Sequence, residues 1–246
     1  MLYIVFLDGA FILALMLLRR FVELLAPSLT ASSLFNSSAT LVFGLVLFTL
    51  YYLLILMLYS FIKFFVLHLI QNTIAPRELR MERFFSFYGL NISLVGIFVA
   101  VAGVLLYAFN AAKQPYQMMV FLFMAIPYLL LLFVMLNTAH SIFYAKECSV
   151  WRTIKQTFSF TFTRAHKYGP IVGWCALLIL LFIIVLFIPG MLIRSIAQSN
   201  PALYVSLYGQ FSIVVGIVGW VALYIVTAVS RLAFYIVVGE LDAPSA

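Results

Sequence analysis

The sequence predicts an all-α membrane protein, built as a bundle of six transmembrane helices. Six long apolar blocks occupy almost all of the 246 residues. Hydrophobic residues make up 66% of the chain and charged residues only 9%, which is too little charge to cover a water-soluble surface. Basic residues gather in alternate connections between the blocks, as they do in proteins that cross a membrane several times.

Each apolar block has the length that a membrane span requires. A hydrocarbon core of about 30 Å takes about 20 helical residues to cross, so six spans leave no room for a separate soluble domain. We therefore expect residues 1–246 to form a single integral membrane domain. The expected spans are 2–25, 39–62, 92–112, 118–144, 171–193 and 211–237.

The even-numbered blocks end alike, which suggests three hairpin-like units. Ser60, Ser141 and Ser230 each open a short run rich in aromatic residues at the end of a block. Such a repeat is known from transporters, although aromatic residues also gather at helix ends because they prefer the membrane interface.

The connections between spans predict the orientation of the chain. The long connections after the second and fourth spans are basic, whereas the opposite connections carry only Lys113 and Arg194. By the positive-inside rule, the long connections and both termini lie on the cytoplasmic side of a cell membrane. Arg19 and Arg20 would then lie near the outer face, so five spans with an interfacial first helix is the competing topology.

Each basic connection is predicted to contain a short amphipathic helix. In the first, Pro76 suits the first helical position, and Leu79, Arg83-Phe84 and Phe87 would form an apolar edge. In the second, Ser149 suits an N-cap, with Trp151, Ile154 and Phe158 on one face.

These two helices have two possible partners. They could lie in the headgroup layer with their basic residues on anionic lipid, or they could dock a cytoplasmic protein. The residues expected to face lipid or a partner are Arg77, Arg80, Arg83, Trp151, Arg152 and Lys155.

Polar residues within the spans form the candidate ligand site. Asp8 and Arg231 lie at similar depths from the cytoplasmic side, so an ion pair would join the first and last helices; alternatively, Arg231 snorkels to the headgroups. The polar residues of the spans could together line a cytoplasm-facing cavity, which would suit an anionic lipid headgroup or another phosphorylated ligand. A simpler explanation for these residues is that they form hydrogen bonds between helices. The candidate residues are Asp8, Lys63, Asn137, His140, Thr227 and Arg231.

Small residues predict one packing surface. Ser93, Gly96, Ala100 and Gly103 follow helical spacing in the third block, and small residues let membrane helices approach closely. We therefore expect a bulky side chain at Gly96 to lower stability.

The sequence predicts no catalytic residue, cofactor or metal site. No Ser-His or Cys-His pair and no paired carboxylate stands at a spacing typical of an active site. No carboxylate or cysteine joins His68 and His140 at ligand spacing.

One segment resembles a known family. It comprises Ser149–Phe158, then Arg164 and Tyr168-Gly-Pro170, leading into an apolar span. It resembles the six-helix domain at the amino end of some bacterial glycerophosphodiester phosphodiesterases, and the stand-alone relatives of that domain. The resemblance implies a six-helix membrane domain without catalytic residues, since the phosphodiesterase chemistry belongs to a separate soluble barrel with no counterpart in these residues.

These observations favour a non-enzymatic accessory or lipid-interacting membrane protein, whose partners are anionic lipids or a cytoplasmic protein and not nucleic acid. The alternative is a small transporter or permease subunit for an anionic or amphipathic substrate. A transporter needs polar residues and a discontinuous helix at the midplane, whereas Leu177 to Leu186 is almost purely apolar.

Overall fold

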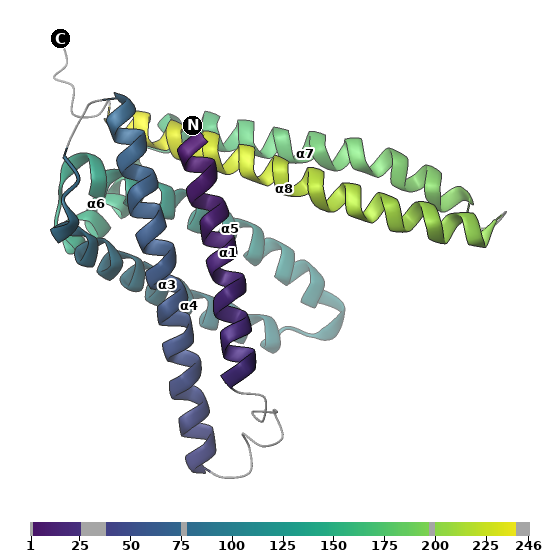
Figure 1. Cartoon of the computed structure of the whole chain (residues 1–246), viewed down its shortest axis with the longest axis horizontal. Coiled ribbons are helices and arrows are strands. Elements are labelled where there is room, and N and C mark those ends of the chain that lie inside the picture. Colours follow the sequence, from purple (N-terminus) through teal and green to yellow (C-terminus); the bar gives the residue numbers. More distant parts are fainter. Residues whose placement is uncertain (1, 26–37, 75–77, 197–199, 240–246) are drawn as a thin grey trace. The chain divides into compact units, whose positions relative to one another are not determined.

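All regular structure in the part of the chain that the computed structural model describes, residues 2–25, 38–74, 78–196 and 200–239, is helical. The all-α prediction is confirmed. Figure 1 shows the elements in chain order: α1 (Leu2–Leu25), α3 (Ser38–Ile74), the 3-10 turn η1 (Met81–Arg83), α4 (Phe84–Ala111), α5 (Gln114–Lys146), α6 (Val150–Thr163), α7 (Ala165–Ile196) and α8 (Pro201–Gly239).

Five helices, α3, α4, α5, α7 and α8, are long and apolar enough to cross a membrane. They contain 28 to 39 residues, and a rise of 1.5 Å per residue makes them about 42 to 58 Å long. Most of their large apolar side chains are exposed, which is a stable arrangement in lipid and not in water. The chain is therefore a membrane-embedded helical protein.

Helix α1 differs from these five. Its 24 residues would extend about 36 Å, enough to cross the hydrocarbon core. It carries Asp8, Arg19 and Arg20, however, and is not among the five helices that qualify by length and apolar composition. The sixth span therefore stays a prediction.

Helices α3, α5, α7 and α8 extend beyond both ends of the predicted spans, and a cap fixes where α8 begins. Helix α8 begins at Pro201, ten residues before the predicted span. The side-chain Oδ1 of Asn200 accepts the backbone N–H of Leu203 at 3.0 Å, which is the hydrogen bond of an N-cap residue. Proline at the first helical position needs no hydrogen-bond partner.

The chain divides into two compact units, each described here by itself. Unit 1 comprises the residues up to Tyr128 together with Lys146–Ile154, and unit 2 comprises Leu129–Ala145 together with the residues from Lys155 onward. Helices α5 and α6 contribute to both units.

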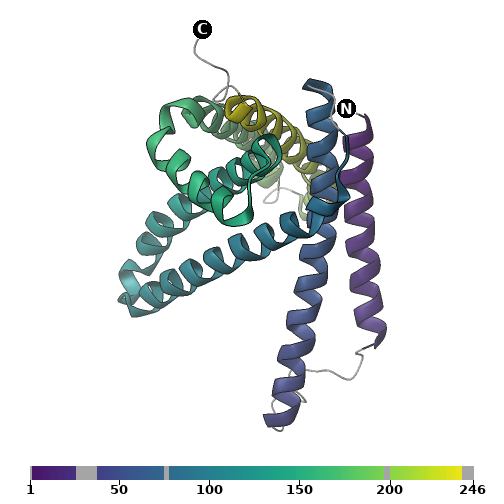
Figure 2. The same cartoon turned by 90° about the vertical axis from the view of Figure 1, so that its left-hand side faces the viewer.

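In unit 1, α3 packs against both α1 and α4, and α1 and α3 run side by side in Figure 2. The buried residues of α3 and α4 lie in the second half of α3 and between Phe84 and Phe98 of α4. The ring of Phe64 lies between those of Phe84 and Phe87, at centroid distances of 6.1 and 5.7 Å. Aromatic packing thus joins α3 and α4 near the first basic connection.

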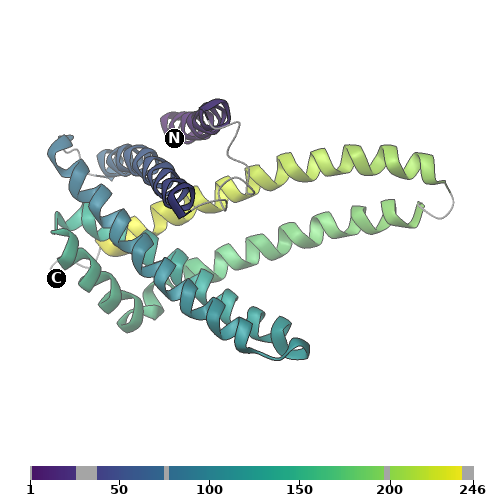
Figure 3. The same cartoon turned by 90° about the horizontal axis from the view of Figure 1, so that it is seen from below.

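In unit 2, α7 and α8 form a long hairpin (Figure 3). At its far end, the ring of Phe211 lies 3.4 Å from the position that a Cβ on Gly190 would take. At the opposite end, the ring of Phe234 lies 5.9 Å from that of Phe133 and 6.1 Å from that of Tyr168. These rings join α5, α7 and α8.

The structure corrects the prediction of an amphipathic helix in the first basic connection. Pro76 and Arg77 lie outside the described residues. From Glu78 onward the chain forms only the single 3-10 turn η1 before α4 begins at Phe84. Phe84 and Phe87 are buried in α4, so the apolar residues that suggested an interfacial helix belong to the core of unit 1.

The structure also contradicts the predicted packing surface on α4. A Cβ added at Gly96 or Gly103 would meet no atom within 4 Å among the described residues. Gly96, Ala100 and Gly103 are all exposed. The side of α4 that packs carries larger residues, Asn91, Leu94 and Phe98.

We now expect Gly96→Leu to change the free energy of unfolding by no more than about 0.5 kcal/mol, because the new side chain meets open space. Thermal unfolding of the purified protein in detergent measures this. Asn91→Leu is the matched control on the same helix and should be destabilising, since Asn91 is buried and hydrogen-bonded. A large loss for Gly96→Leu would restore the original packing prediction.

Candidate functional site

The two basic connections meet at Glu147. This residue ends α5 in the left-handed backbone conformation, with φ of 50°. Its Oε2 accepts a hydrogen bond from Nη1 of Arg80 at 3.4 Å, and its Oε1 lies 3.9 Å from Nη1 of Arg83. Arg80 and Arg83 belong to the first connection and Glu147 to the second. Both connections therefore lie at the same end of unit 1.

These ion pairs show that the two connections lie close together, but they contribute little to the stability of the fold. The side chains of Arg80 and Glu147 are 65% and 39% exposed, and exposed ion pairs contribute at most about 1 kcal/mol. The structure pairs Arg80 with a residue 67 positions away in the sequence, a contact that the sequence did not predict.

Helix α6 lies within the second connection and buries one side. The buried residues recur at helical spacing along it: Thr153, Ile154, Thr157, Phe160 and Thr161. The backbone N–H and the Oγ1 of Thr153 both donate to the carbonyl oxygen of Ser149, each at 2.9 Å. Ser149 thus lies where the N-cap was predicted, and Thr153 satisfies its hydroxyl within its own helix.

The other side of α6 combines aromatic and basic residues. Trp151 is 76% exposed and Phe162 is 66% exposed, and Arg152 and Lys155 are exposed beside them. The sequence grouped Trp151 and Phe158 with Ile154, but only Ile154 is buried. Threonine methyl groups fill the positions that an apolar face would have used, so the aromatic side chains stay outside.

Of the candidate polar residues of unit 1, Lys63 follows a residue that forms an interhelical hydrogen bond. Nδ2 of Asn91 on α4 donates to Oγ of Ser60 on α3 at 2.9 Å, and both residues are buried. Lys63, one turn after Ser60, is only 5% exposed, whereas Asp8 on α1 is half-buried. Asn91 was not among the residues predicted from the sequence, although a lone amide at the start of an apolar block signals such a bond.

The other four candidates lie in unit 2. Nδ2 of Asn137 donates to the carbonyl oxygen of Phe133 at 2.9 Å, and Oγ1 of Thr227 donates to that of Leu223 at 2.7 Å. Both bonds stay within one helix, so these groups are satisfied without a ligand. His140 is buried and Arg231 is half-buried. A single site formed by all six candidates stays a prediction, because Asp8 and Lys63 belong to unit 1.

Metal ligands do not gather in the described ranges: no group of three or more His, Cys, Asp or Glu residues there could hold a metal ion. The two cysteines differ in their surroundings. Cys148 is half-exposed between α5 and α6, whereas Cys175 is buried in α7.

The chain matches no protein-family model, no curated protein and no solved structure. The resemblance to the membrane domain of glycerophosphodiester phosphodiesterases therefore stays an expectation that rests on the residues quoted for it.

The ion pair predicted between Asp8 and Arg231 has a direct test. Asp8→Asn and Arg231→Gln would each leave one charge without its partner, so the double variant should lose less stability than the sum of the single losses. The expected coupling is about 0.5 to 3 kcal/mol, measured by unfolding in detergent. Strictly additive losses would rule the pair out.

Proposed function

We propose that this protein is a non-enzymatic, multi-pass membrane protein that binds anionic lipid headgroups at its basic connections. The single observation that carries the proposal is the exposed side of α6, where Trp151 and Phe162 stand beside Arg152 and Lys155. Aromatic residues that enter the interface and basic residues that contact phosphate are typical of helices lying in the headgroup layer.

The contact between the basic connections supports this proposal. Because Arg80 and Arg83 lie near Glu147, the first connection adds its charge to the end of unit 1 from which α6 starts. The chain carries a formal net charge of +7, and an anionic leaflet attracts such a basic surface. In this arrangement both connections face the cytoplasm, α1 is the sixth span and both termini are cytoplasmic.

We expect Arg152→Gln combined with Lys155→Gln to weaken the retention of phosphatidylglycerol by about thirtyfold, because each basic residue near an anionic surface contributes about 1 kcal/mol. Native mass spectrometry of the full chain, titrated with phosphatidylglycerol in detergent, measures the bound lipid.

The matched control neutralises two cations on the opposite connections, Lys113→Gln and Arg194→Gln, and should leave retention unchanged. Equal retention by both double variants would contradict the proposed lipid surface. A defined extra protein mass that disappears only in the α6 variant would instead identify a protein partner.

Cys148 offers a test of topology that needs little engineering. In a Cys175→Ala variant, Cys148 is the one remaining thiol of the sequence. A membrane-impermeant maleimide should label it only after the cell is permeabilised. In a cysteine-free background, Lys113→Cys should be labelled on intact cells. The reverse pattern would invert the orientation and move the basic connections to the outside.

The alternative function, a small transporter or permease subunit, draws support from two buried polar side chains. Lys63 and His140 are both almost fully buried within spanning helices, and ionisable groups in such positions commonly serve ion or substrate pathways. Leu177 to Leu186 in α7 offers no polar group to such a pathway. Flux of an anionic amphiphile into vesicles, lost in Lys63→Met, would favour this alternative.

A further inference from the structure

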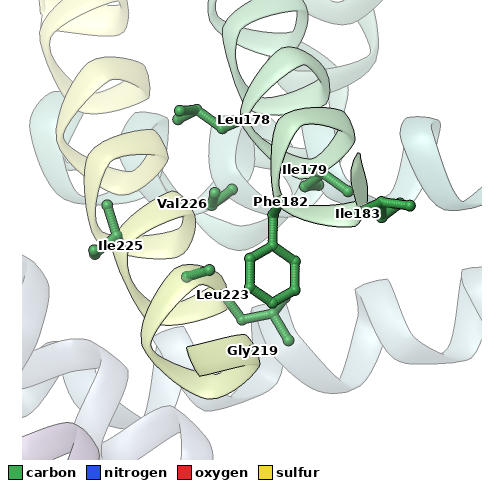
Figure 4. Close-up of a pocket in the computed structure, with 9 residues that line it drawn as sticks. Leu178, Ile179, Phe182, Ile183, Gly219, Leu223, Ile225 and Val226 are labelled. Carbon is green, nitrogen blue, oxygen red and sulfur yellow. The ribbon is translucent and has the colours of Figure 1, made fainter. Parts of the chain in front are cut away.

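A groove lies between α7 and α8 in unit 2, near the middle of both helices (Figure 4). Its volume is about 390 Å³. The residues that line it are Leu178, Ile179, Phe182, Ile183, Gly219, Ala222, Leu223, Ile225 and Val226. We call this hollow the α7–α8 groove.

Only hydrocarbon side chains line the α7–α8 groove. Val226 is buried and Phe182 half-buried, whereas Ile183 and Leu223 at its edges are exposed. The ring of Phe182 lies 3.6 Å from the position that a Cβ on Gly219 would take. Glycine at this position leaves room beside the ring. Because the lining offers no hydrogen bonds, water would not stay in the groove.

We propose that the α7–α8 groove binds an acyl chain of a membrane lipid. Its lining lies at 178–183 within Ala165–Ile196 and at 219–226 within Pro201–Gly239, so it sits at the level of the lipid tails. The volume of 390 Å³ is well above the ~30 Å³ that one water molecule occupies in the liquid, so the groove has room for several methylene groups of one chain.

The surface suits a flexible chain better than another helix. Membrane helices associate through small residues that allow close approach and through polar groups that bond across the interface. The small residues of the groove are only Gly219 and Ala222, and the ring of Phe182 lies beside Gly219. The remaining lining is branched or aromatic, and a flexible chain adapts to such an uneven surface. This binding does not depend on the headgroup, and it is independent of the proposed basic surface.

Filling the groove tests the inference. The full chain is stripped of lipid in detergent and titrated with zwitterionic phosphatidylcholine, and native mass spectrometry counts the bound lipid. The wild type should retain one molecule. Gly219→Leu should weaken retention by about tenfold, because the new side chain occupies the space of the acyl chain. If Gly219→Leu does not fold, Ala222→Leu takes its place, because it fills the same groove and should weaken the retention of phosphatidylcholine in the same way.

Gly216→Leu is the matched control. It lies one turn away on α8, where an added Cβ would meet no atom within 4 Å, and it should retain phosphatidylcholine like the wild type. Three results would overturn the inference: no retained phosphatidylcholine on the wild type, equal retention by the filled variants and the wild type, or loss of phosphatidylcholine in the Arg152→Gln, Lys155→Gln variant. The last result would assign the lipid to the basic surface instead.

Discussion

Lipid gives apolar helices no hydrophobic reason to associate, so the fold depends on the few places where helices offer polar or closely fitting groups. The structure concentrates its buried residues in such places. In α3 they begin at Ser60, in α5 at Val134 and in α8 at Val226, toward the carboxyl end of each helix. Ser60 accepts the hydrogen bond from Asn91. Packing and polar contacts therefore occupy the same region of each unit, and most of the remaining length is left to face lipid tails.

The length of the helices explains why the parts that hold the buried residues can pack like the core of a soluble protein. Helices of 33 to 39 residues, such as α3, α5 and α8, exceed the roughly 20 residues that the hydrocarbon needs. In the proposed arrangement, their extra turns reach the headgroup layer and water. The burial of Phe87 in unit 1 and of Phe234 in unit 2 would then again be driven by the removal of apolar surface from water. The same helices can thus pack through the hydrophobic effect at one end and bind lipid along the rest.

The sequence was informative about helices and poor at placing their ends. Long apolar runs identified the spanning helices because hydropathy reports which residues tolerate lipid. It does not report where a backbone stops being helical, which depends on caps such as Asn200 before Pro201. The same limitation affected the first connection. Phe84 and Phe87 resembled an interfacial edge, but their partner Phe64 comes from a distant part of the chain. No local pattern could reveal that contact.

The candidate lipid surface was predicted by residue type and corrected by geometry. From sequence, Arg77, Arg80 and Arg83 were expected to face lipid or a partner, and no local pattern indicated a carboxylate from the other connection. In the fold, Glu147 lies against Arg80 and Arg83, so one carboxylate offsets part of the positive charge of the first connection. Arg152 and Lys155 on the exposed side of α6 have no acidic residue within one helical turn in sequence. The proposed attraction to anionic lipid therefore rests more on α6 than on the arginines that precede α4, which is why Trp151 beside Arg152 marks the centre of the proposed surface.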